Sequence, residues 1–176
     1  VVVVVIESLR PELLTKEVMP NLSRLAEEAI HCRSHFSGGN ATNHGVFSLV
    51  TGLEPIWFGT SQRFDPGMFR WFKSLGYETG FFAGADDWHK FHMSGFIRSQ
   101  LFDQYETKRR DGIASDRRAV ELAAAFLSGD DTGLHEEPTR KPRLAIVYLY
   151  GTHATYQSYP SDQLDQPAAD NRFPFP

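Results

Sequence analysis

The sequence is poor in three features that would each point to a particular class of protein. Cys32 is its single cysteine, so no internal disulfide framework is possible, although one cysteine does not decide the compartment. No run approaches the ~20 apolar residues that a membrane-spanning helix needs. Positive charge is not in excess, because 18 basic side chains against 22 acidic ones give a net charge of −4. Such a chain lacks the basic footprint of nucleic-acid binding, so we expect no nucleic-acid partner.

What the sequence does contain is typical of a globular domain. Apolar residues make up 41% and aromatic residues 13%, which supplies a core and excludes a wholly disordered or collagen-like chain. The 176 residues suffice for one ordinary domain and are too few for two large ones. The chain opens without a start methionine inside an apolar stretch, and it stops at Phe-Pro-Phe-Pro without a closing element. We therefore expect residues 1–176 to form part of one domain that is incomplete at both ends.

Apolar patterning predicts an α/β domain. Residues 1–6, 77–83 and 144–150 are apolar without alternation, which is typical of strands covered on both faces in a parallel sheet. Helical spacing and turn signals predict the other elements, which are helices over 20–30, 42–50, 66–75 and 115–127 and a short strand over 31–36. In the helix over 42–50, the side chains expected to face the core are Val46, Leu49 and Val50. The alternation predicts a three-layer α/β/α fold with a mainly parallel sheet, whose chemistry lies at the carboxyl ends of the strands.

Two polar side chains follow predicted strands directly. Glu7 comes after the first strand, where a carboxylate can bind a divalent cation through oxygen. The alternative for Glu7 is an N-cap or a loop salt bridge. His153 follows the third strand and could bind a metal or an anionic substrate oxygen, or it could be an ordinary surface residue.

The turn over residues 37–42 leads into a predicted helix. Its glycines allow the backbone to approach an anion closely, and a helix N-terminus favours negative charge. Thr42 could therefore be an N-cap or a nucleophile whose alkoxide a metal stabilises. Asn40 within the turn and His44 in the first helical turn are candidate substrate-binding residues.

Four segments together resemble a known family. Residues 1–11 (VVVVVIESLRP) look like the opening strand of the sulfatase-like branch of the alkaline phosphatase superfamily, and residues 19–26 (MPNLSRLA) look like its next helix. Residues 37–52 resemble its nucleophile segment, and residues 148–160 resemble its later strand and histidine loop. Each piece is loose, but the set in this order is specific.

The resemblance implies an alkaline-phosphatase-like fold and a metal-dependent enzyme that acts on phosphate or sulfate esters. Carried over by position, Glu7 would be a metal ligand, Thr42 both nucleophile and metal ligand, and His153 a ligand of the substrate. The metal would be Zn²⁺ or Mn²⁺, with the remaining ligands expected beyond residue 176. The chain would then be the N-terminal portion of one sulfatase-like catalytic domain, an enzyme in its full-length parent and inactive alone.

The nucleophile position distinguishes the branches of the family. Formylglycine sulfatases resemble one another in a Cys or Ser nucleophile followed four residues later by Arg, whereas this chain has Thr42 and Val46. Threonine cannot be oxidised to that aldehyde, so phospho-group transfer is favoured. Thr42 with Glu7 looks more like phosphoethanolamine transferases and lipoteichoic acid synthases. Residues 87–90 also resemble a headgroup-binding stretch of the latter, in which Trp88 and Lys90 would contact substrate; the alternative is a rim tryptophan beside surface charges.

The analogy has consequences for location and partners. Such transferases are anchored in the membrane with the catalytic domain outside the cytoplasm, so we expect an extracytoplasmic location, an anchor outside this chain and a lipid headgroup as a possible substrate. Two alternatives stay open, a non-catalytic membrane-associated lipid-binding regulator of the same fold and a sulfuric ester hydrolase.

Overall fold

The structure is a computed structural model of residues 1–176 that describes residues 1–59, 65–85, 92–108, 114–129 and 141–153. The strands are β1 (Val2–Ile6), β2 (Glu78–Ala83), β3 (Gln104–Glu106) and β4 (Arg143–Leu149). The α-helices are α1 (Pro20–Glu28), α2 (Thr42–Thr51), α3 (Gly67–Ser74) and α4 (Ala114–Ser128). Short 3-10 helices lie at Pro11–Leu13, Pro55–Gly59, Met93–Gly95 and Ser99–Leu101. In this described part of the chain, no helix is long and apolar enough to cross a membrane.

The described strands form one four-stranded sheet in the order β1-β4-β2-β3. All three pairings are parallel; Val3 pairs with Ile146, Phe81 also pairs with Ile146, and Phe81 pairs with Tyr105 on its other side. Parallel neighbours need crossover connections, and the intervening helices provide them. The prediction of a mainly parallel sheet containing the strands near residues 1–6, 77–83 and 144–150 is confirmed. β3 is not among the predicted strands.

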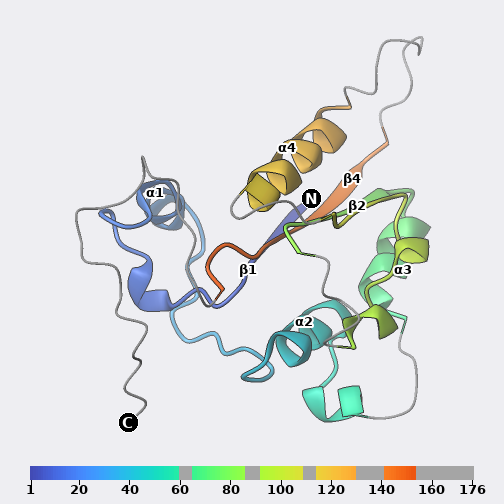
Figure 1. The fold of residues 1–176 in the computed structure, drawn as a ribbon, viewed down its shortest axis with the longest axis horizontal. Coiled ribbons are helices and arrows are strands. Elements are labelled where there is room, and N and C mark those ends of the chain that lie inside the picture. The colour runs from blue at the N-terminus through green and yellow to red at the C-terminus, as the bar shows by residue number, and fades with distance from the viewer. Residues whose placement is uncertain (60–64, 86–91, 109–113, 130–140, 154–176) are drawn as a thin grey trace.

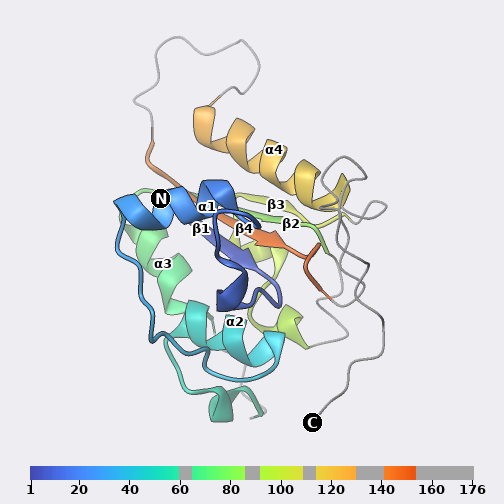
Figure 2. The same cartoon turned by 90° about the vertical axis from the view of Figure 1, so that its left-hand side faces the viewer.

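Helices cover both faces of the sheet, as Figure 1 and Figure 2 show from two directions, which confirms the three-layer α/β/α prediction. Alternate residues of β4 divide between the faces. Ile146 and Tyr148 join a core with α2 and α3, whereas Ala145 and Val147 pack against α4. This period-two division is the consequence of the pleat, and it orients Tyr148 towards the α2 side.

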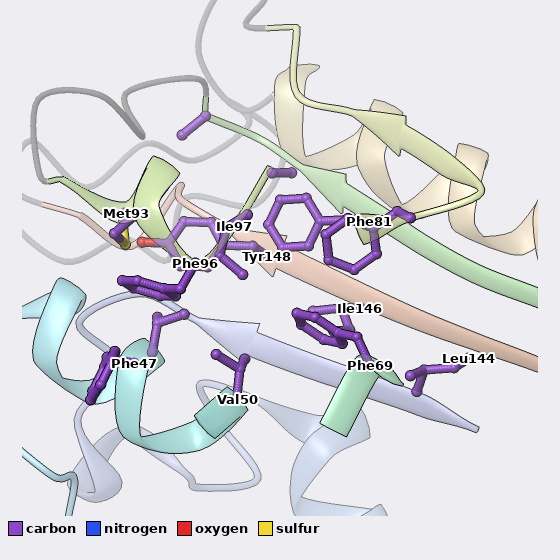
Figure 3. Packing of buried hydrophobic residues seen from close by; sticks show 14 residues of the cluster. Phe47, Val50, Phe69, Phe81, Met93, Phe96, Ile97, Leu144, Ile146 and Tyr148 are labelled. Carbon is purple, nitrogen blue, oxygen red and sulfur yellow. The ribbon is translucent and has the colours of Figure 1, made fainter. Parts of the chain in front are cut away.

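Aromatic rings dominate the core on the α2 and α3 side. Figure 3 shows Phe47 and Phe96 near one end of this cluster and Phe69 and Phe81 further along it. The rings of Phe47 and Phe96 meet edge to face with centroids 5.4 Å apart. Edge-to-face pairs add directional attraction to the burial of apolar area, so this pair joins α2 to the segment that follows the 3-10 helix Met93–Gly95.

β1 corrects the expectation of a strand covered on both faces. It lies at an edge of the described sheet, and the side chains of Val2 and Val4 are 51% and 54% exposed. Val3 and Val5 pack on the α2 core, whereas α4 lies over β4 and β2. The uninterrupted apolar run of residues 1–6 therefore predicted the strand correctly, but it did not predict that one face of the strand is exposed.

Three further local predictions are wrong. Residues 31–36 form no strand, and they are exposed with no strand pairing among the described residues. The first α-helix ends at Glu28, so Ile30 is 95% exposed. In α2 the buried residues are Val46, Phe47 and Val50, because the contact face is rotated and leaves Leu49 49% exposed.

Asp103 joins β2 to α3, and we expect its removal to destabilise the fold. Its Oδ2 accepts hydrogen bonds from the N–H (2.7 Å) and hydroxyl (3.0 Å) of fully buried Thr79, and its Oδ1 accepts one from Lys73 (3.2 Å). Asp103→Ala should lower the free energy of unfolding by about 1–3 kcal/mol, because it leaves buried donors without an acceptor. Urea unfolding measures this change.

The same contact predicts a pH dependence. Burial by itself raises the pKa of Asp103, but the hydrogen bonds from Thr79 and Lys73 outweigh it and lower the pKa below its usual value. The stabilisation is therefore complete at neutral pH and is lost as the pH falls through the folded-state pKa, which lies below that of an unfolded aspartate. The stability difference between wild type and Asp103→Asn should shrink between about pH 7 and about pH 3. An unchanged difference would contradict the prediction.

Candidate active site

A cavity of about 360 Å³ opens where β1, β2 and β4 end and α2 begins. Its lining residues are Glu7, Ser8, Asn40, Ala41, Thr42, Asn43, Ala85, Met93, Tyr148, Tyr150 and His153. A larger open hollow of about 880 Å³ adjoins it along β1 and α2, and both share Glu7, Asn40 and Thr42 in their walls. The carboxyl edge of a parallel sheet is the usual place for such a site.

Glu7 and Thr42 lie in direct contact at this edge. The Thr42 hydroxyl donates a hydrogen bond of 2.6 Å to Glu7 Oε1. Thr42 is the first residue of α2, and Ala41 occupies the N-cap position without a side-chain capping bond. The N-cap interpretation of Thr42 is therefore wrong, and its hydroxyl points into the site. Two oxygens of a shared ion must lie within about 5 Å of each other, and this pair meets that condition.

Both oxygens of the Glu7 carboxylate accept hydrogen bonds from hydroxyl groups. Ser8 donates to Oε1 (3.2 Å), and the Tyr148 hydroxyl donates to Oε2. Burial, reinforced by the hydrogen bond to Glu7, raises the pKa of Tyr148 well above its usual value. Tyr148 thus stays a neutral hydrogen-bond donor to Glu7.

The loop after β4 brings His153 to the same cavity. The Thr152 hydroxyl donates to the backbone carbonyl of Glu7, and the backbone N–H of His153 donates to the backbone carbonyl of Tyr150 (2.9 Å). The His153 ring stacks on Tyr150 with centroids 4.4 Å apart and an interplanar angle of 13°. His153 therefore lines the cavity with its ring held against Tyr150.

The other predicted site residues differ in their placement. Asn40 lines the cavity beside Thr42. His44 does not line it; its ring meets Phe58 edge to face (5.4 Å), and its Cβ lies where a side chain on Gly39 would stand. Trp88 and Lys90 lie outside the described residues. The functional roles of all these residues stay predictions.

Sequence reasoning missed Tyr148 and Tyr150 as wall residues. Tyr148 was counted only as part of a buried strand, although a tyrosine at the carboxyl end of an otherwise aliphatic strand carries a polar tip that must find a partner. That need for a hydrogen-bond partner was the available signal.

The donor set suits a divalent cation in part. Glu7 and Thr42 offer a carboxylate and a hydroxyl oxygen, which hard cations prefer. In residues that the structure describes, no group of three or more His, Cys, Asp or Glu side chains could hold an ion. This part of the chain therefore brings together two oxygen atoms of the kind that hard cations bind.

Comparison with known proteins identifies a family. A family model described as Sulfatase matches residues 1–173, nearly the whole chain. No curated protein matches the sequence. The parallel sheet with helices on both faces agrees with the alkaline-phosphatase-like fold of that family.

Proposed function

Because the chain belongs to the sulfatase family, whose members hydrolyse or transfer sulfate or phosphate esters, we propose that it transfers a phospho-group through a covalent intermediate on Thr42. The observation that carries this proposal is the 2.6 Å hydrogen bond from the Thr42 hydroxyl to Glu7 at the start of α2. A nucleophile beside a carboxylate and at a helix N-terminus has an acceptor for its proton and a favourable field for an anionic substrate.

The first step forms the bond between Thr42 Oγ1 and phosphorus. The Thr42 proton passes to Glu7 Oε1, and the bond from phosphorus to the leaving oxygen breaks with its electron pair on that oxygen, which takes a proton from solvent. His153, which lines the same cavity, hydrogen-bonds the non-bridging oxygens, on which charge develops.

The second step releases the enzyme. Water or an acceptor hydroxyl attacks phosphorus and gives its proton to solvent. The bond from phosphorus to Thr42 Oγ1 breaks, and Oγ1 recovers its proton from Glu7. Tyr148 holds the other carboxylate oxygen throughout, so the acceptor oxygen stays directed at Thr42.

Members of this family usually use a divalent metal. Glu7 and Thr42 would hold the ion here, since their oxygens already lie together. With an ion bound, the Thr42 proton would leave to solvent instead of passing to Glu7, because a carboxyl group must stay deprotonated to serve as a ligand. Zn²⁺ or Mn²⁺ so bound would lower the pKa of the Thr42 hydroxyl and polarise the phosphoryl oxygen.

Phosphate rather than sulfate chemistry is proposed because of the nucleophile. Threonine cannot yield formylglycine. Val46, a buried residue of α2, stands where the related sulfatases have arginine. By analogy with transferases of this type, we place the reaction at the extracytoplasmic face of a membrane, with a lipid headgroup ester as substrate. The larger hollow beside Thr42 offers room for such a substrate.

Trapping the intermediate tests the proposal. The full-length protein, incubated with a phospho-donor, quenched in acid and digested, should carry a phospho-adduct on the peptide that contains Thr42. Mass spectrometry locates the adduct, and Thr42→Ala supplies the matched control without one. An adduct on Ser37 or Ser48 would overturn the assignment.

A binding role is the second candidate. It is supported by the open hollow of about 880 Å³ beside Thr42, which has room for a lipid headgroup. A lipid-binding regulator would use the same cavity without turnover. Metal analysis of the full-length protein separates the two, since stoichiometric transition metal together with turnover supports the enzyme, and the lack of both supports the regulator.

A further inference from the structure

The loop that carries His153 is held by a carboxylate from a different part of the fold. Asp116 lies in the first turn of α4. Its Oδ1 accepts a hydrogen bond from the Tyr150 N–H (2.8 Å), and its Oδ2 accepts one from the Gly151 N–H (2.6 Å). Two consecutive amides bound to one charged carboxylate fix the backbone where it leaves β4, because such charge-assisted bonds are short and directional.

Gly84 makes room for this carboxylate. A Cβ built on Gly84 would collide with Asp116 Oδ1 and would stand 3.2 Å from the Asp116 backbone nitrogen. The backbone of Gly84 is not in the left-handed region, so its requirement for glycine is spatial. Its own N–H donates to the Tyr148 carbonyl (2.9 Å), which places it directly beside β4.

The loop is fixed on its opposite side by the site itself. Thr152 donates to the Glu7 carbonyl, and the Tyr150 and His153 rings are stacked. Asp116 does not line the cavity, whereas Glu7, Tyr150 and His153 do. The position of His153 relative to Glu7 thus depends on two anchors, one at each side of residues 150–152.

We propose that Asp116, seated in the space left by Gly84, is a positioning residue that sets His153 for binding an anionic substrate oxygen. This inference rests on the proposed function, which gives His153 its role. Without the Asp116 carboxylate, the two amides lose their shared acceptor and the loop shifts on its remaining anchor at Thr152. Displacements near 1 Å at such groups cost about 100-fold in rate.

Asp116→Asn and Gly84→Ala test the proposal from two different elements. Asparagine keeps the shape but presents an NH₂ group to one of the two amide donors, whereas alanine at Gly84 pushes an intact carboxylate away. Both variants should shift the His153 ring signals in NMR spectra of histidine-labelled full-length protein, as the Tyr150 stack changes. Both should weaken the binding of inorganic phosphate and lower kcat/KM for a phosphate ester about 10–100-fold.

Matched controls isolate the effect from a general loss of stability. Gly67→Ala adds a methyl group at a glycine whose added Cβ would have no neighbour within 4 Å. Glu121→Gln removes an exposed carboxylate from α4, the helix that carries Asp116. Neither should alter the His153 signals or phosphate binding. The double variant Gly84→Ala/Asp116→Ala should be less impaired than the sum of its single changes, because the clash disappears with the carboxylate.

The outcomes separate this inference from the proposed function. Unchanged His153 signals and phosphate affinity within twofold of wild type in both Asp116→Asn and Gly84→Ala would overturn the positioning role. A second outcome is that both variants alter the His153 signals while phosphate binding is unaffected even by His153→Ala. Asp116 would then anchor the loop without setting a substrate ligand, and the proposed role of His153 in substrate binding would fail as well. Should Asp116→Asn fail to fold, Gly84→Ala with its double variant decides the question.

Discussion

Replacing Thr42 with alanine is expected to reduce turnover of a phosphate ester by about 1,000-fold or more, because it removes the group that attacks phosphorus. The fold should persist. Thr42 makes no capping bond in α2, and the Glu7 carboxylate retains its bonds from Ser8 and Tyr148. The free energy of unfolding should fall by only about 0.5–1.5 kcal/mol, the net value of one hydrogen bond. Steady-state kinetics and urea unfolding measure the two effects.

The opposite end of the same helix offers a matched control. The Thr51 hydroxyl donates to the Phe47 carbonyl (2.7 Å), so Thr51→Ala removes an equivalent hydroxyl away from the site. Thr51→Ala should leave turnover unchanged, and Thr42→Ser should keep partial activity because a primary hydroxyl occupies the same place. Full activity in Thr42→Ala would refute covalent transfer through this residue.

Replacing Glu7 with glutamine should have the second large effect. Glutamine keeps the shape but removes the charge and replaces one acceptor oxygen with an NH₂ donor. In the wild type, the hydroxyls of Thr42 and Tyr148 donate to different oxygens of the Glu7 carboxylate. In the glutamine variant, one of these two hydroxyls would therefore face the NH₂ group instead of an oxygen. Changes to residues that only support the metal ligands typically lower metal affinity about 10–100-fold. We expect Glu7→Gln to lower the affinity for Mn²⁺ or Zn²⁺ by more than this, and turnover to fall in parallel.

Calorimetric titration with Mn²⁺ measures the loss of affinity. Glu12→Gln is the control, since Glu12 is an exposed carboxylate nearby in sequence that pairs with Arg10. Tyr148→Phe should weaken metal binding less than Glu7→Gln, because it removes one hydroxyl but leaves the charge. Unchanged metal affinity and turnover in Glu7→Gln would show that Glu7 is not a ligand.

The elements of the fold were largely predictable because their signals are local. The apolar run over 144–150 indicates a strand, and the helical spacing over 115–127 indicates a helix. The structure places β4 and α4 within one or two residues of those bounds. The coverage of Val2 and Val4 was not predictable, since it depends on which strand becomes an edge and which helix lies over it. β3 was missed because three residues carry too little periodicity to identify a strand.

The candidate site was predictable only where a residue adjoins a recognisable element. Glu7 follows β1 and Thr42 begins α2, so order along the chain and the family resemblance pointed to both. Asp116 gave no such signal, because a carboxylate in the first turn of a helix ordinarily serves that helix. Its bonds to residues 150 and 151 arise from the packing of α4 beside β4.

The contacts around Glu7 also decide when during folding the site can exist. Glu7 meets Tyr148 across a sequence separation of 141 residues, and β1 pairs along its length with β4. Contacts of such high contact order form late, because the entropy of closing the intervening chain is lost before the pairing is gained. A nascent chain therefore cannot assemble the cavity until β4 has left the ribosome, and partly folded states with β2 and α3 in place lack it. Phosphate binding would accordingly report the docking of β4 against β1.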